Sequence, residues 1–160
     1  MNEIATTISL NGREVTRRAP AHETLLRWLR EVGALDARMG CGEGVCGACA
    51  VLVDGEAVSS CLVLAAQVDG GDVRTAFSLA GDDGTMSDLQ RAFLDHGAVQ
   101  CGFCTSGMLV GATELLEQDE VPDRDQIARH LEGNLCRCTG YANAIDAVRE
   151  VAERRAGRSR

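Results

Sequence analysis

Eight cysteines, in two groups of four, are the residues best suited to chemistry in this chain of 160 residues. The first group reads Cys41-x4-Cys46-x2-Cys49, with Cys61 following. The spacing of its first three members matches the plant-type pattern for a [2Fe–2S] cluster. The C-x2-C-x2-C run typical of a bacterial four-iron cluster is absent. The first group therefore predicts a [2Fe–2S] site.

Glycines are interleaved with these ligands at positions 40, 42, 44 and 47. A loop that wraps a cluster needs residues at positive φ, which glycine adopts at little cost. Its amides can then donate to the cluster sulfurs. A structural zinc site is the alternative interpretation, but zinc sites usually present two short cysteine pairs rather than a tight triplet.

The second group, Cys101-x2-Cys104 and Cys136-x-Cys138, is less specific when taken alone. A C-x2-C pair at the start of a helix could also be a thiol redox pair, and C-x-C is unusual for zinc. Two pairs at helix ends can converge between helices, where bundles commonly hold cofactors.

The first half of the chain must position the first group. Alternating apolar residues over 4–10, the Asn11-Gly12 turn and a return over 13–16 predict a hairpin. Helical spacing over 25–32 predicts a helix that ends at Gly33. A second hairpin over 50–59 and a strand over 73–77 complete the pattern. These elements predict a small α+β domain over residues 1–78.

The second half predicts only helices. Capping-box patterns begin at Ser87 and Asp123, Thr105 can open another helix, and apolar spacing marks a last helix over 144–152. We therefore expect an all-α four-helix domain over residues 79–160.

Composition narrows the classes of function. The net charge of −8 argues against nucleic-acid binding, which usually needs a basic face. The N-terminus has no secretory pattern, and no apolar stretch approaches the roughly 20 residues of a membrane span. We expect a cytoplasmic protein, in which eight cysteines are metal ligands rather than disulfides.

Four motifs in order carry a resemblance that covers nearly the whole chain: GCGEGVCGAC, then Cys61, then QCGFCTSGM, then GNLCRCTGY. Together they resemble the small iron–sulfur subunit of the molybdenum hydroxylases, a family that includes xanthine dehydrogenase, aldehyde oxidoreductase and aerobic carbon monoxide dehydrogenase. The resemblance implies an N-terminal β-grasp ferredoxin-like domain and a C-terminal four-helix bundle, each with one [2Fe–2S] cluster. Ser106 departs from the family, where proline is common at this position.

The resemblance also implies a role and partners. The chain would relay electrons without performing substrate chemistry. An inner cluster (Cys101, Cys104, Cys136, Cys138) would lie nearest the molybdopterin of a large subunit. An outer cluster (Cys41, Cys46, Cys49, Cys61) would lie toward the FAD of a medium subunit, in a dimer of heterotrimers. Gln100 and Cys138 would approach the pterin; the alternative for Gln100 is a bond within its own loop.

Two other functions stay open on the sequence alone. One is a free-standing two-cluster ferredoxin, and the other is a zinc-stapled interaction module. Asn134, Thr139, Gly140 and Tyr141 predict a tight turn and a helix start. The substrate is left open among aldehydes, N-heteroaromatics, purines, carbon monoxide and aryl-CoA.

Overall fold

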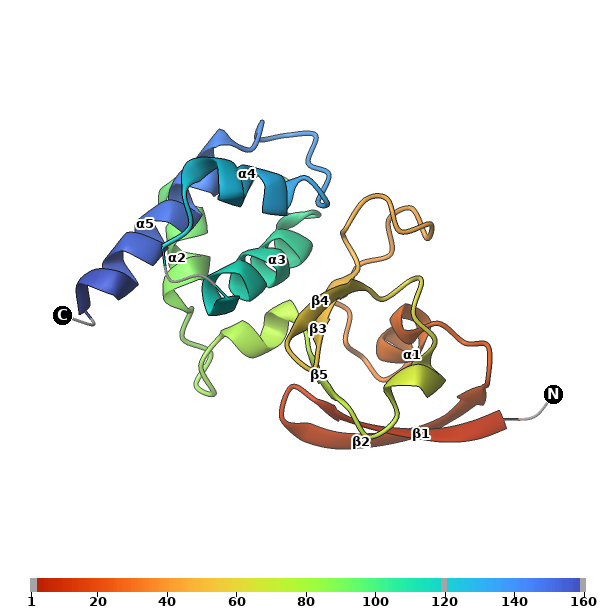
Figure 1. Ribbon diagram of the computed structural model, residues 1–160. Coiled ribbons are helices and arrows are strands. Elements are labelled where there is room, and N and C mark those ends of the chain that lie inside the picture. The colour runs from red at the N-terminus through yellow and green to blue at the C-terminus, as the bar shows by residue number, and fades with distance from the viewer. Residues whose placement is uncertain (1–2, 119–120, 159–160) are drawn as a thin grey trace.

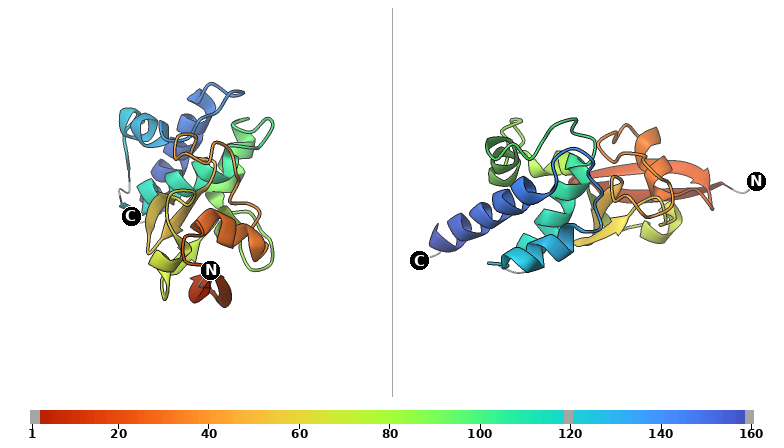
Figure 2. Two further views of the ribbon diagram at one scale, coloured as in Figure 1. Left: turned by 90° about the vertical axis from the view of Figure 1, so that its right-hand side faces the viewer. Right: turned by 90° about the horizontal axis from the view of Figure 1, so that it is seen from above.

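The computed structural model describes residues 3–118 and 121–158. A sheet-based N-terminal part and a helical C-terminal part lie side by side, and the two chain ends point away from each other (Figures 1 and 2). The predicted α+β architecture is confirmed. No helix in the described ranges is long and apolar enough to cross a membrane.

The N-terminal part is built on one five-stranded sheet of order β2-β1-β5-β3-β4. Its strands are β1 (Glu3–Leu10), β2 (Arg13–Pro20), β3 (Ala50–Val53), β4 (Glu56–Ser59) and β5 (Asp72–Arg74). The strand β5 pairs parallel with β1 and antiparallel with β3. It therefore joins two hairpins that are far apart in sequence into one sheet.

Helix α1 (Leu25–Glu31) packs against this sheet (Figure 1). Thr24 caps its first turn by accepting from the Arg27 amide, and Gly33, at φ +92°, follows its end. The apolar face that the sequence predicted is buried, with Trp28 wholly inaccessible. This helix and the sheet enclose the core of the N-terminal part.

Two predicted strand limits are wrong. The strand β2 runs to Pro20 rather than stopping near residue 16, because it pairs with β1 along its full length; proline is tolerated there since β2 is an edge strand. The strand β5 ends at Arg74 rather than at Phe77. The Thr75 amide bonds the side chain of Asn11, and residues 76–79 form a 3-10 helix.

The helical part contains four helices within the described ranges: α2 (Asp88–Asp95), α3 (Thr105–Gln118), α4 (Arg124–Leu131) and α5 (Ala142–Arg158). Both predicted capping boxes are present, Ser87 with Gln90 and Asp123 with Gln126. The helices enclose a second core of aliphatic residues and Phe93. The all-helical second half is therefore confirmed.

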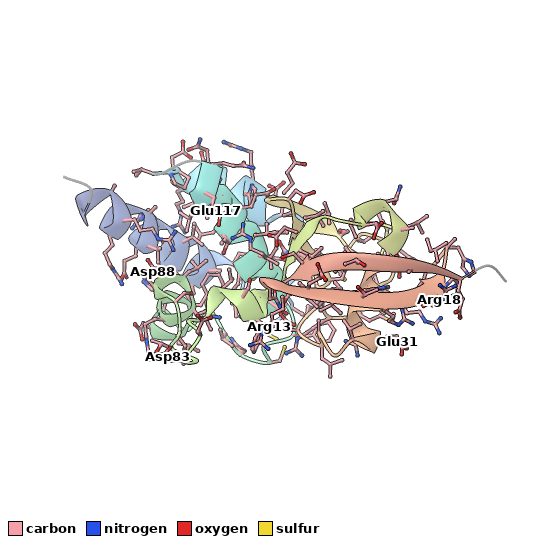
Figure 3. All side chains as sticks on the ribbon, turned by 90° about the horizontal axis from the view of Figure 1, so that it is seen from below. Arg13, Arg18, Glu31, Asp83, Asp88 and Glu117 are labelled. Carbon is pink, nitrogen blue, oxygen red and sulfur yellow. The ribbon has the colours of Figure 1, made fainter. Side chains whose placement is uncertain are left out.

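Helix α3 belongs to both parts. One side contributes to the helical core, while Val110 packs against Leu52 of β3 and Ala76 in a small cluster between the two parts. Further along the same helix, Glu117 (labelled in Figure 3) forms a two-bond ion pair with Arg74 of β5. A helix whose two sides are both covered holds the sheet and the bundle together.

Candidate metal centres

The first cysteine group lies at one end of the β3–β4 hairpin and in the loop that leads into it. Cys49 directly precedes β3, and Cys61 follows shortly after β4. Because these strands pair antiparallel, Ala50 opposite Ser59, the hairpin brings the two cysteines to the same end. Both are buried, whereas Cys41 is exposed.

Backbone amides surround the sulfur of Cys41. The amides of Glu43, Val45 and Cys46 donate to its Sγ at 3.3, 3.4 and 3.4 Å. Gly42, at φ +74°, helps the loop to turn these N–H groups inward. The Glu43 amide, followed by those of Cys46 and Val45, lowers the pKa of the Cys41 thiol to about 6. This loop favours a thiolate, the form that binds iron.

The buried member of the same group behaves differently. Burial, followed by the hydrogen bond with Cys49, raises the pKa of Cys61 to about 11. The Ser60 hydroxyl donates to the carbonyl of Cys49 at 2.6 Å and ties the two ends of the hairpin together. A buried sulfur that is protonated at neutral pH must release its proton when it binds a metal.

The second cysteine group lies between two helix termini. Cys104 directly precedes α3, and Cys136 and Cys138 lie between α4 and α5. The Sγ atoms of Cys101 and Cys138 are 3.6 Å apart. Sequence positions that are more than thirty residues apart therefore meet, as the resemblance implied.

Polar groups support the second group. The Thr139 hydroxyl lies 3.2 Å from Cys136 Sγ, and the Tyr141 hydroxyl accepts from the Cys136 amide at 2.8 Å. Burial opposes ionisation of Cys136, but the hydrogen bonds of Thr139, Cys138 and Cys104 together outweigh it and lower the pKa of Cys136 to about 7. Burial raises the pKa of Cys104 to about 12. A cluster held here would have both hydroxyl contacts at one ligand, Cys136.

The predicted turn and helix start at 134–141 are present, since α5 begins at Ala142 and Tyr141 has φ +68°. The contacts of Thr139 and Tyr141 with Cys136 did not follow from the sequence. The one sequence feature that points to these contacts is that two residues with hydroxyl groups closely follow a candidate ligand, in Cys-Thr-Gly-Tyr.

Gln100 is exposed and donates through Nε2 to the carbonyl of Cys138 at 3.2 Å. It therefore bonds to the loop opposite its own rather than within its own loop. The two residues that the resemblance assigned to a pterin lie together on the exposed side of the second group.

The two cysteine groups approach each other through their loops. The Leu135 amide donates to the carbonyl of Cys46 at 3.0 Å, and the Asn134 side chain donates to the carbonyl of Gly47 at 3.1 Å. A Cβ added to Gly40 would lie 2.7 Å from Cys46 Sγ and 3.5 Å from the Phe103 ring. All eight cysteines thus belong to one region of the molecule.

The donor sets fit [2Fe–2S] clusters. Each set offers four thiols, and amide or hydroxyl donors lie against their sulfurs. In residues 3–118 and 121–158, no three His, Cys, Asp or Glu side chains converge tightly enough to hold a single metal ion. A [2Fe–2S] cluster is held by four thiolates spread over two irons, which is the number of thiols that each set offers.

Comparison with known proteins agrees with this geometry. Residues 8–80 match a family model described as a 2Fe-2S iron-sulfur cluster binding domain, and residues 75–149 match one described as a [2Fe-2S] binding domain. The chain is 51% identical over 142 residues to the nicotine 6-hydroxylase small subunit of Paenarthrobacter nicotinovorans, covering 88% of this chain and 85% of that one.

Two further comparisons extend this result. The chain is 44% identical over 144 residues to the xanthine dehydrogenase iron-sulfur-binding subunit of Escherichia coli O157:H7, covering 88% of this chain and 89% of the other. Its structure superposes on quinoline 2-oxidoreductase from Pseudomonas putida 86 with a TM-score of 0.92 and 39% identity, over 97% of both chains.

Proposed function

The chain belongs to the iron–sulfur subunits of the molybdenum hydroxylase family, and from this premise we propose how its residues carry out electron transfer. When bound, a [2Fe–2S] cluster accepts and releases one electron at a time. The protein supplies ligation, burial and positioning. A free-standing ferredoxin is not favoured, because the relatives are subunits of larger oxidoreductases.

Each cysteine group holds one cluster in this proposal. The first group (Cys41, Cys46, Cys49, Cys61) belongs to the sheet domain, residues 1–78, and the second (Cys101, Cys104, Cys136, Cys138) to the helical domain, residues 79–160. The amide donors around Cys41 and the hydroxyl beside Cys136 support this assignment, because such donors stabilise negative charge on sulfur.

The observation that carries the proposal is the direct hydrogen bond between the two loops. Cys46 belongs to one group, and Leu135 directly precedes Cys136 of the other. A path of covalent bonds therefore joins Cys46 to Cys136 with one hydrogen bond in it. That hydrogen bond is the 3.0 Å contact from the Leu135 amide to the Cys46 carbonyl. Such a path suits a relay that hands electrons from one group to the other.

We propose that the second group faces a molybdopterin on a large partner subunit and that the first faces an FAD on a medium subunit. Gln100 and Cys138 lie exposed beside each other and are positioned to meet a pterin edge, since an amide both donates and accepts.

We expect the complex to be a dimer of heterotrimers in the cytoplasm. An N-heteroaromatic substrate fits the relatives named for nicotine, xanthine and quinoline.

Exposed apolar side chains around the cysteine loops support the proposal that partner subunits bind there. Val45 and Leu62 flank the first group, and Phe103 and Leu135 flank the second; each is more than two-fifths accessible. We propose that these four side chains form part of the surfaces that partner subunits cover, since exposed apolar surface is typical of protein interfaces.

Metal analysis of the purified complex tests the proposal. This chain should contribute about four irons and about four acid-labile sulfides, and substrate should bleach their visible absorption. Reduction should give two distinguishable paramagnetic signals, since one cluster lies in a sheet domain and the other among helices. Stoichiometric zinc in this chain without visible absorption would contradict the proposal.

A further inference from the structure

A buried asparagine connects the two cysteine loops. Asn134 belongs to the helical part, and its side chain donates to the carbonyl of Gly47, a residue 87 positions earlier in the first cysteine loop. Asn134 is only 6% accessible. A buried amide costs free energy unless it is hydrogen-bonded, so its place between the two loops calls for an explanation.

Three glycines make room for this side chain. A Cβ at Gly47 would lie 2.5 Å from Asn134 Nδ2, one at Gly107 would lie 2.8 Å from the same atom, and one at Gly111 would lie 3.3 Å from Oδ1. Gly107 and Gly111 come from α3, one helical turn apart, and Gly47 comes from the sheet part. We call these three residues the glycine socket.

The local turn does not require the side chain. The backbone amide of Asn134 already donates to the carbonyl of Leu131, which closes the turn after α4. Among residues 3–118 and 121–158, the side-chain amide donates to the carbonyl of Gly47, across the boundary between the two parts. The side chain therefore acts on the loop of the first cysteine group rather than on its own.

The bond of Asn134 is adjacent to the bond between the ligand loops. Asn134 bonds Gly47, and the next residue, Leu135, bonds Cys46. These two consecutive bonds fix both the distance and the register of the loops. Links elsewhere between the two parts, such as Arg74 with Glu117, attach α3 to the sheet and do not touch either cysteine loop.

We propose that Asn134, seated in the glycine socket, is a positioning residue that sets the separation and relative orientation of the two [2Fe–2S] clusters. This inference rests on the proposed function, because it needs both clusters to be present. Asn134 touches neither cysteine group as a ligand; it acts through Gly47 and the neighbouring Leu135–Cys46 bond.

The experiment uses the assembled complex and compares Asn134→Asp with Asn143→Asp. Aspartate has nearly the same shape as asparagine but cannot donate to a carbonyl, so the first change removes the bond to Gly47. Asn143 is a control of the same chemistry at an exposed position, since its side chain also donates to a glycine carbonyl, that of Gly97, but within the helical part. Both clusters are reduced, and their magnetic dipolar interaction is measured by electron paramagnetic resonance.

We expect Asn134→Asp to lose part of the mutual splitting of the two signals and to slow electron transfer between the clusters, while Asn143→Asp matches the unchanged complex. The dipolar interaction falls with the cube of the separation and does not respond to an added charge. The dipolar splitting therefore distinguishes a displaced cysteine loop from a change in the reduction potential of a cluster.

Gly111→Ala provides a second, uncharged variant. Alanine is favoured over glycine inside a helix, so α3 is retained, while the new Cβ presses on Asn134. We expect a smaller change in the same dipolar splitting. If Asn134→Asp assembles without its clusters, the splitting in Gly111→Ala tests the inference instead. Unaltered splitting with both clusters present would overturn the inference. Absence of clusters from the unchanged chain would instead refute the proposed function.

Discussion

At the scale of single residues, the cysteines differ in how the chain prepares them for a metal. Amides lower the pKa of Cys41 to about 6, whereas burial raises that of Cys61 to about 11. The exposed loop thus presents a ready thiolate, and the hairpin end presents a buried thiol. The first is suited to capture iron and the second to close the site against water.

The order of the relay is tested by Cys61→Ala in the full complex. The change removes one proposed ligand of the first group and should destroy the outer cluster, while the helical group keeps its four cysteines. Substrate should still reduce the inner cluster in a single turnover, but steady-state turnover with an acceptor that takes electrons from the flavin should collapse. Failure of substrate to reduce either the helical-group cluster or the flavin would reverse the proposed order.

The hydroxyl of Thr139 should tune the inner cluster. It lies 3.2 Å from Cys136 Sγ, and a hydrogen bond to a ligand sulfur stabilises the more negative, reduced state. Thr139→Val should therefore lower the reduction potential of the inner cluster, as measured by redox titration. The outer cluster in the same sample is the internal control, and a shift of both potentials would argue against a local effect.

Residue types and spacing were enough to predict the first group of candidate ligands, because its cysteines have the short separations of a plant-type [2Fe–2S] site. The second group is less specific by spacing alone, and the family resemblance assigned it to a cluster. Residue types and spacing did not predict that Thr139, Tyr141 and Asn134 would contact the two loops. These contacts depend on where a side chain turns after the backbone has folded, and threonine, tyrosine and asparagine are equally common in ordinary turns.

At the scale of elements, α3 shows what a periodic pattern can hide. The sequence predicted a helix opened by Thr105, and in the structure one face of this helix lies in the bundle core while a second face lies against the sheet part. The residues of that second face are Gly107, Val110, Glu114 and Glu117. Helical spacing of small residues and carboxylates resembles an exposed face, so the sequence alone does not distinguish solvent from a second domain.

Glu114 is the polar centre of this second face. One carboxylate oxygen accepts from the Ala57 amide of β4 at 2.6 Å, and the other lies 3.0 Å from His130 of α4. Glu114→Ala should destabilise the chain by about 1–3 kcal/mol, because it leaves a partly buried amide without its acceptor. The midpoint of thermal bleaching of the visible absorption measures this change.

Glu117→Ala is the matched control on the same helix. Its ion pair with Arg74 is 31% and 43% accessible at the two side chains, and exposed pairs contribute about 0–1 kcal/mol. Equal losses for the two variants would show that Glu114 contributes no more than an ordinary surface charge.

At the scale of the whole molecule, the sheet and the bundle should unfold together. Val110 packs between them, and the two cysteine loops are hydrogen-bonded to each other. The chain has one tryptophan, Trp28, which is wholly buried in the sheet part. Its fluorescence therefore reports on that part alone, while far-ultraviolet circular dichroism reports mainly on the helices.

We expect the two signals of the loaded chain to change at the same temperature. Coincident transitions are the mark of cooperative unfolding. A tryptophan transition well below the helical one would show that the two parts melt independently.

The division into a sheet part and a helical part was predictable, since the period of the apolar pattern changes from strand-like to helical near the middle of the chain. Their mutual placement was not. It depends on close approach of backbone at Gly47 and Gly107, where an added Cβ on Gly107 would lie 2.2 Å from the Gly47 carbonyl. Glycine has no side chain to signal such an approach.

The position of β5 in the middle of the sheet has a consequence for how the chain matures. The ribosome releases both hairpins and all four cysteines of the first group before it releases residues 72–74, which join the hairpins. Isolated hairpins are marginal in water. A nascent chain halted before β5 should therefore fail to retain iron, and one extended past it should begin to do so. The first cluster would then be inserted only after the ribosome has released β5 and the sheet is complete.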